Sequence, residues 1–135
     1  MTRFYDIDEA NATLGELESI ATVLAEQRAE LVRLRDHALA RSPGTANDVE
    51  PLSDDELRTL RLRMQGLVDQ MAAGVARIDQ LGLSLRDIES GLVDFPALVA
   101  GRQVWLCWRR GEPQIGWWHD LDTGFSGRRP LAELA

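Results

Sequence analysis

Residues 104–119 read VWLCWRRGEPQIGWWH and predict the β part of the fold. Two runs of aromatic and aliphatic residues flank Arg-Arg-Gly-Glu-Pro, a pattern typical of a β-hairpin. A two-residue turn at Gly111 and Glu112 would set the register of the two strands. The predicted pairs are Trp108–Ile115, Leu106–Trp117 and Val104–His119 on one face, and Trp105–Trp118, Cys107–Gly116 and Arg109–Gln114 on the other.

Neither face of this hairpin is plainly polar, so both faces need cover. One face can pack on helices. The other would be covered by residues 83–99, by the tail that carries Phe125, or by a partner molecule. Four tryptophans in one short stretch are typical of a small sheet that builds its core from large side chains, and any that stay exposed would form an interaction surface.

Upstream of the hairpin, apolar residues recur every three or four positions along two long segments. The first segment, residues 7–40, follows Asp6, which forms the spacing of a capping box with Glu9. Residues 41–52 contain two prolines and a glycine and are predicted to form a loop. The second segment, residues 53–82, opens with another capping-box spacing. We therefore expect two amphipathic α-helices.

The short connection between these helices favours an antiparallel hairpin, in which Gly74 would let the two backbones approach closely. The expected fold class is α+β: a long, coiled-coil-like helical hairpin followed by a small antiparallel sheet in residues 83–135. The length of the chain corresponds to one domain, residues 1–135. Because two helices alone leave much of their seam exposed, we also expect self-association, with a homodimer as its simplest form.

Charge and hydropathy exclude several classes of partner. The chain has 15 arginines, no lysine and 22 acidic residues, and its net charge is −7. Residues 1–89 hold 17 acidic and 10 basic residues, whereas residues 90–135 hold five of each. An acidic chain repels a phosphate backbone, so nucleic acid is not expected as a partner. No segment is typical of a membrane span or a signal peptide, and the single cysteine, Cys107, permits no internal disulfide, so we expect a cytoplasmic protein.

Short motifs occur near both ends of the chain. Their residues are Tyr5-Asp6, Glu9-Ala10-Asn11 and Leu14, then Arg86-Asp87, Gly91-Leu92-Val93-Asp94-Phe95-Pro96, Gly101-Arg102, Leu106-Cys107-Trp108-Arg109, Gly111-Glu112, Trp118-His119, Gly124-Phe125, Gly127-Arg128 and Pro130. Together they resemble a family of short bacterial proteins catalogued only as a domain of unknown function. Asp6, Gly15 and Arg86 stand where that family more often has Ser or Thr, proline, and lysine. The resemblance implies a helix-plus-sheet fold and a bacterial, cytosolic origin, and it implies no chemistry.

The polar residues of these motifs are the candidates for a functional site. His119 ends a strand and can serve as a general base, with Asp94 or Glu112 as its carboxylate partner. The alternative is a histidine that is hydrogen-bonded for structural reasons alone. The candidate binding residues are Glu9, Asn11, Arg102, Trp108, Arg109, Trp118 and Arg128. No metal or cofactor is expected, because the predicted register puts Cys107 and His119 on opposite faces and leaves too few ligands for zinc. Metal binding through oxygen ligands alone stays open as an alternative.

Two functions stay open. The chain has no P-loop, dinucleotide-binding glycine pattern, nucleophile elbow or HExxH motif, which favours a non-enzymatic interaction or scaffold protein over an enzyme. Such a protein would bind a protein partner or a second copy of itself through the Trp- and Arg-rich end of the sheet. The alternative is a small-ligand-binding protein or hydrolase-type enzyme with a site around His119, Asp94 and Glu112, between the sheet and the start of the first helix.

Overall fold

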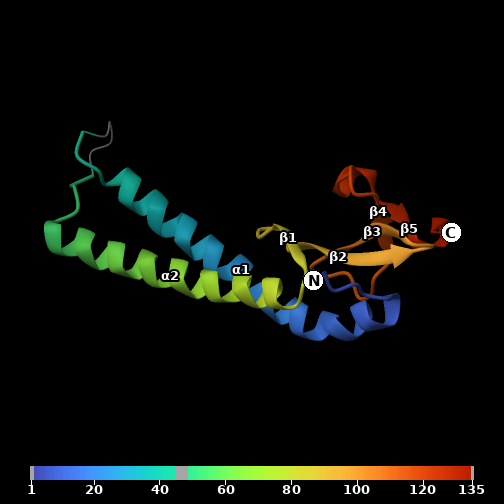
Figure 1. Ribbon diagram of the computed structural model, residues 1–135. Coiled ribbons are helices and arrows are strands. Elements are labelled where there is room, and N and C mark those ends of the chain that lie inside the picture. Colours follow the sequence, from blue (N-terminus) through green and yellow to red (C-terminus); the bar gives the residue numbers. More distant parts are fainter. Residues whose placement is uncertain (1, 45–48, 135) are drawn as a thin grey trace.

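The computed structural model describes residues 2–44 and 49–134, in which two long helices precede a five-stranded sheet (Figure 1). Helix α1 spans Ile7–Ala40 and α2 spans Asp54–Gln80. The other elements are β1 (Ser84–Asp87), β2 (Leu92–Val99), β3 (Arg102–Arg109), β4 (Trp117–His119), the 3-10 helix η1 (Phe125–Gly127), β5 (Arg129–Pro130) and the 3-10 helix η2 (Leu131–Glu133). The predicted α+β class is confirmed. Part of the predicted loop, residues 45–48, lies outside the described residues.

Both helices begin where their capping residues predict. The side chain of Asp6 accepts a hydrogen bond from the backbone N–H of Glu9 at 2.7 Å, and the side chain of Glu9 accepts one from the backbone N–H of Asp6. Ser53 caps α2 by accepting a hydrogen bond from the backbone N–H of Glu56 at 3.1 Å. These bonds satisfy N–H groups that have no partner within the helix, so the helix starts are local properties of the chain.

The two helices pack antiparallel, as predicted. Glu16, near the start of α1, forms an ion pair with Arg77, near the end of α2, at 2.6 Å. Gly74 lies against Leu24, and a Cβ atom at this position would come within 3.0 Å of the leucine side chain. The close approach expected at Gly74 is therefore confirmed. Among the described helices, none is long and apolar enough to cross a membrane.

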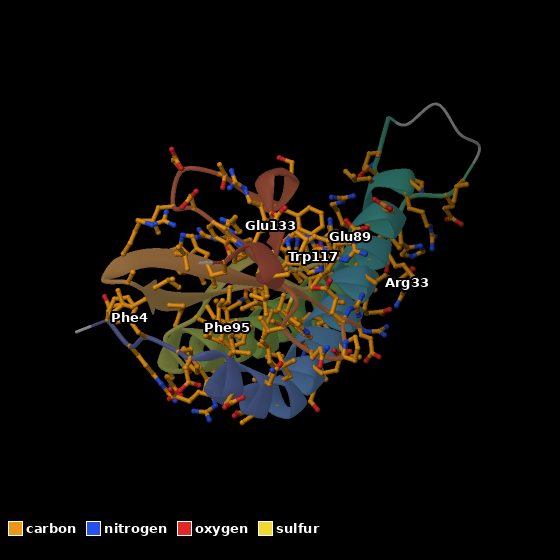
Figure 2. All side chains as sticks on the ribbon, turned by 90° about the vertical axis from the view of Figure 1, so that its right-hand side faces the viewer. Phe4, Arg33, Glu89, Phe95, Trp117 and Glu133 are labelled. Carbon is orange, nitrogen blue, oxygen red and sulfur yellow. The ribbon has the colours of Figure 1, made fainter. Side chains whose placement is uncertain are left out.

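The sheet is antiparallel throughout, with its strands in the order β1-β2-β3-β4-β5. The first half of α1 lies against one face, and the C-terminal segment lies over the other (Figure 1). Figure 2 shows Phe95 on the helix side of the sheet and Trp117 on the side of the C-terminal segment. The core between α1 and the sheet contains Ala10, Leu14, Leu17, Ala21, Leu24, Val93, Phe95, Ala97, Val104, Leu106, Trp108 and Trp118. The distal half of the hairpin extends beyond the sheet.

The predicted register of the β3–β4 hairpin is wrong by one residue. In the structure Trp105 pairs with His119, Leu106 with Trp118 and Cys107 with Trp117. Residues 110–116 connect the two strands, in place of the predicted two-residue turn at Gly111 and Glu112. Because side chains alternate between faces, this shift moves Trp118 into the core and puts His119 on the same face as Cys107.

Two contacts account for the longer connection. The side chain of Asn11, on α1, accepts a hydrogen bond from the backbone N–H of Ile115 at 2.7 Å, and Ile115 is itself buried in the core. The indole N–H of Trp108 donates to the backbone carbonyl of Glu112 at 3.0 Å. Packing against α1, rather than local turn preference, therefore sets the register.

Candidate functional site

The face of the sheet that points away from α1, the outer face, has a polar centre. Asp94 on β2 lies directly opposite Cys107 on β3, and His119 on β4 lies opposite Trp105. Alternate residues of a strand share a face, so these four side chains point to the same side. We call Asp94, Cys107 and His119 the outer-face cluster; each exposes at most 3% of its surface.

Asp94 and His119 form a close buried pair. Nε2 of His119 lies 3.0 Å from Oδ2 of Asp94. Since β3 separates their strands, the two side chains meet over Cys107, whose small side chain leaves room for them. Oδ2 also accepts a hydrogen bond from Nε of Arg86 at 2.9 Å. Arg86 is the extra residue of a bulge in β1, and bulges commonly redirect a side chain toward a site.

The hydrogen bonds of His119 define which ring nitrogen faces Asp94. Nδ1 is 2.8 Å from the backbone carbonyl of Asp120, which can only accept, so Nδ1 carries a hydrogen. A neutral imidazole would then turn the lone pair of Nε2 toward the carboxylate of Asp94, and two acceptors would face each other. Nε2 is therefore the ring nitrogen that faces Oδ2 of Asp94.

Cys107 is a buried thiol rather than an activated nucleophile. Burial raises the pKa of Cys107 to about 11, and the carboxylate of Asp94 adds to this rise. The guanidinium of Arg128, 4.0 Å from Sγ, opposes it only weakly. Both ring nitrogens of His119 are engaged elsewhere, so the histidine does not activate the thiol. The geometry does not support covalent catalysis by Cys107.

Glu112 and Arg128 close one side of the cluster. Two hydrogen bonds, of 3.1 and 3.3 Å, join the Arg128 guanidinium to the Glu112 carboxylate. The guanidinium lies 4.4 Å from the ring of Trp117 and 4.3 Å from that of Phe125. Glu112 also accepts a hydrogen bond from the backbone N–H of Arg109 at 2.7 Å. Glu112 is thus engaged with arginine residues and is not the carboxylate partner of His119.

A cavity of about 390 Å³, the outer-face cavity, lies over Asp94 and His119. Its walls come from the sheet and from the C-terminal segment that crosses it. The remaining lining residues are Arg86, Leu92, Trp105, Leu121, Asp122, Thr123, Gly124 and Phe125. The expectation of a site between the sheet and the start of α1 is wrong, because the one-residue shift in register carries His119 to the opposite face.

A comparison with known protein families identifies the family of this chain. The model of an uncharacterized conserved protein family, DUF2203, matches residues 3–131. The chain belongs to the DUF2203 family. No curated protein and no solved structure matches it. The match spans both helices and all five strands, and the resemblance to a domain of unknown function is confirmed.

Three polar residues predicted for the site have structural contacts in this DUF2203 protein. Glu9 completes the capping box of α1, and Asn11 holds the backbone of Ile115. Arg102 forms an ion pair with the side chain of Asp120, the residue whose carbonyl accepts the hydrogen of His119. Arg102 therefore supports the position of His119 without contacting it.

The predicted aromatic binding residues lie in the core. Trp108 is fully buried and Trp118 is 3% exposed, whereas Arg109 is exposed and lies 5.6 Å from the ring of Phe125. Trp105, which was not predicted as a site residue, lines the outer-face cavity, with the guanidinium of Arg86 5.0 Å from its ring. Trp105 and Cys107 were missed because the predicted register put them on the opposite face from His119. Arg86 was missed because a bulge in β1 sets its position. The motif Leu106-Cys107-Trp108-Arg109 was the sequence signal that could have identified Cys107 as a site residue.

Alkaline pH should destabilise this DUF2203 protein after treatment with a chelator. The pKa of Cys107 rises from 9.0 to about 11 on burial. Below pH 9 both states keep the proton; above it the unfolded state ionises first, so up to about 2–3 kcal/mol of stability is lost by pH 11. The chain has no lysine, and its single tyrosine, Tyr5, has a pKa raised by burial that acts in the same direction.

Urea unfolding at a series of alkaline pH values would measure this loss. Cys107→Ala should flatten much of the decline in unfolding free energy, and Tyr5→Phe the remainder. An equally steep decline in the Cys107→Ala variant would contradict the buried thiol as its cause.

Proposed function

We propose that this DUF2203 protein binds a small polar ligand in the outer-face cavity, where Asp94 and His119 contact it. One observation carries the proposal: a buried carboxylate–imidazole pair forms part of the lining of a cavity. Ligand sites are typically concave and largely apolar, with a few convergent polar groups, and buried titratable groups gather in them.

Packing alone does not account for this pair. Burying polar groups is less favourable than burying apolar residues of similar volume unless every polar atom finds a partner. Oδ1 of Asp94 is buried without a hydrogen-bond partner among the described residues. The helix-facing side of the same sheet has an apolar centre that includes Phe95 and Leu106. The sheet can therefore be built without polar residues, which supports a functional reason for them on the outer face.

The residues allow proton transfer to a bound ligand. Nε2 of His119 and the carboxylate of Asp94 lie side by side, and both are groups that can exchange a proton with a bound ligand. Arg86 and Asp122 offer charged groups of opposite sign to a polar ligand, and Trp105 and Phe125 offer rings for a flat apolar part. These features also suit a hydrolase-type enzyme that uses acid–base rather than covalent catalysis.

A thermal-shift screen tests ligand binding. The panel would contain nucleosides, amino acids, sugar phosphates and small carboxylic acids, chosen because they combine polar groups with small size. We expect at least one compound to raise the melting temperature of the wild type, and Asp94→Asn and His119→Gln to abolish that shift. Glu16→Gln, on the exposed helical ion pair, is the control and should retain it. Hits that persist in both site variants, or a panel without hits, would count against the proposal.

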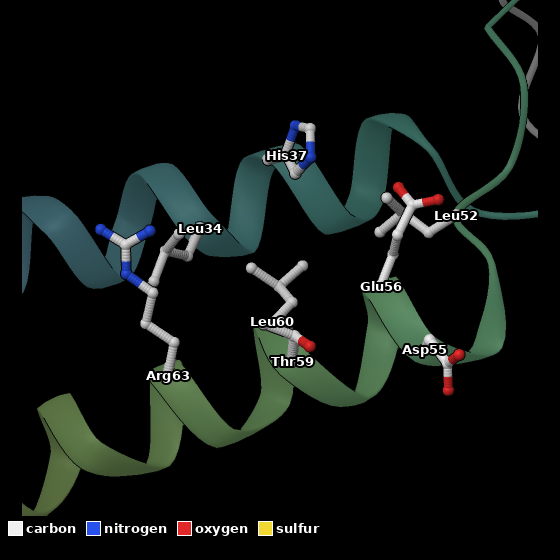
Figure 3. A pocket seen from close by; sticks show the side chains of 8 residues that line it. All are labelled: Leu34, His37, Leu52, Asp55, Glu56, Thr59, Leu60 and Arg63. Carbon is white, nitrogen blue, oxygen red and sulfur yellow. The ribbon is translucent and has the colours of Figure 1, made fainter.

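We also propose that the helical hairpin binds a second copy of the chain. The distal hairpin has a groove of about 450 Å³ lined by Leu34 and His37 of α1 and by Leu60 and Arg63 of α2 (Figure 3). A larger one, of about 710 Å³, includes Leu31, Val32, Met64 and Val68. Pairing two such hairpins would cover these apolar side chains in a four-helix bundle. The sequence favoured the end of the sheet as the interaction surface. The helical hairpin takes that role in this proposal, because Trp108 and Trp118 of the sheet are buried.

Sedimentation velocity from low to high micromolar concentration tests self-association. We expect a dimer that dissociates when Val68, 44% exposed in the larger groove, is changed to Glu. Leu98→Glu is the matched control, since Leu98 is similarly exposed but lies on the sheet. A monomer at every concentration, or equal effects of the two variants, would rule out the hairpin as a dimer interface.

A further inference from the structure

We propose that Asp94, Cys107 and His119 bind one divalent transition-metal ion, best matched by Zn²⁺, and leave a fourth coordination position open toward the outer-face cavity. This inference is independent of the proposed ligand, because it concerns the protein and the ion alone. The sequence argued against a metal only through the predicted register, and the observed register brings the cysteine and the histidine to the same face.

The donor atoms lie close to the spacing that zinc requires. One ligand atom from each side chain lies within 4.8 Å of the other two, and Nε2 of His119 is 3.0 Å from Oδ2 of Asp94. Tetrahedral Zn²⁺ with bonds of roughly 2.0–2.3 Å puts neighbouring ligand atoms roughly 3.3–3.8 Å apart. Side-chain shifts of roughly 1 Å therefore complete the three-ligand set.

His119 is already oriented as a metal ligand. A metal-bound histidine usually donates its other ring N–H to a carbonyl or carboxylate, which directs the free lone pair at the ion. Nδ1 of His119 donates to the backbone carbonyl of Asp120, and the side chain of Asp120 is held by Arg102. Nε2 is thus the nitrogen left for the metal, and it is the nitrogen that faces the cluster.

Asp94 has a second carboxylate oxygen, Oδ1, that is also buried. Oδ1 is buried and has no hydrogen-bond partner in the described part of the chain, while Oδ2 is held by Arg86. A metal ion would supply the missing partner for Oδ1 and would relieve the contact between the two acceptors Nε2 and Oδ2. A bound cation would therefore account for both of these unfavourable features of the outer-face cluster.

The chemical types of the three donor groups indicate which metal ion they would bind. A thiolate, an imidazole and a carboxylate match Zn²⁺ and its spectroscopic substitute Co²⁺, whereas Mg²⁺ and Ca²⁺ prefer oxygen ligands alone. Arg86 and Arg128 are the cations nearby, and each is paired with a carboxylate, Asp94 or Glu112. The carboxylates of Asp94 and Glu112 balance these two cations, and Asp122 in the lining of the cavity adds a negative charge that favours a divalent cation.

Metal titration of the full chain, purified without a histidine tag and treated with a chelator, tests the site. We expect one Zn²⁺ per chain by calorimetry and elemental analysis. Co²⁺ should give visible bands of a tetrahedral site and a near-ultraviolet thiolate-to-cobalt band. Cys107→Ser should remove that band. His119→Gln should weaken Co²⁺ binding by roughly 100-fold or more, since the loss of an outer-shell partner alone costs roughly 10–100-fold.

His37→Gln is the matched control, because it removes the other histidine, which lies on the hairpin far along α1. It should leave metal binding unchanged. Circular dichroism of each variant separates loss of the site from loss of the fold, and Asp94→Asn, which keeps the shape of the side chain, provides a second site variant. Absence of stoichiometric binding, binding that survives in folded Cys107→Ser and His119→Gln, or binding lost in His37→Gln would overturn the proposal. The metal titration contains no compound from the ligand screen, so a failure of metal binding and a failure of ligand binding are separate results.

Discussion

Trp108→Ala should lower the free energy of unfolding by about 3–5 kcal/mol, because it leaves a large cavity in the core. Trp108 is fully buried among the residues that join the sheet to α1. Its indole N–H donates to the carbonyl of Glu112, so the substitution also leaves that carbonyl without this partner. Urea unfolding followed by circular dichroism would measure the change.

The neighbouring Arg109→Ala is the control for this prediction. Arg109 follows Trp108 in β3 but is exposed on the other face, so its loss should change stability by no more than about 0.5 kcal/mol. A small effect of Trp108→Ala, comparable to that of Arg109→Ala, would mean that the tryptophan is not a core residue. It would then return to the set of candidate binding residues that the sequence suggested.

His119→Leu should destabilise the chelator-treated protein by about 2–3 kcal/mol, because removing one member of a buried polar pair leaves the other without its partner. The substitution leaves the carboxylate of Asp94, 2% exposed, with Arg86 as its remaining partner. The double variant Asp94→Leu/His119→Leu removes both polar groups and should be much more stable than the sum of the single effects predicts. Chemical unfolding of the four proteins gives the coupling energy directly.

The exposed ion pair between Glu16 and Arg77 provides the comparison for this cycle. Its side chains are about half exposed, so solvent screens their attraction, and removing one or both should give small and additive effects. Additive effects at Asp94 and His119 as well would contradict a close buried pair. A stable double variant would also provide a folded protein in which ligand and metal binding should both be absent.

The sequence identified part of the site. Asp94 and His119 were named together, and the structure brings them within 3.0 Å of each other. Glu112 was named with them but pairs with Arg128. Cys107 was assigned to the opposite face and lies beside both. These two errors have one origin, because the conformation of residues 110–116 places both Glu112 and the start of β4.

The helices and their ends were determined by the sequence itself. Capping at Asp6 and Ser53 and the three-to-four spacing of apolar residues act within a few residues, so they are visible without tertiary structure. The two strands of the hairpin were equally local, whereas the short strand β5, Arg129–Pro130, was not predicted. The strand register was not local, because both faces of the hairpin are rich in apolar residues and a shift by one residue keeps each face plausible. Asn11 on α1, 104 residues before Ile115, accepts a hydrogen bond from the backbone N–H of Ile115 and so supports the observed register. Only the packing of α1 on the sheet therefore decided that Asp94, Cys107 and His119 share a face.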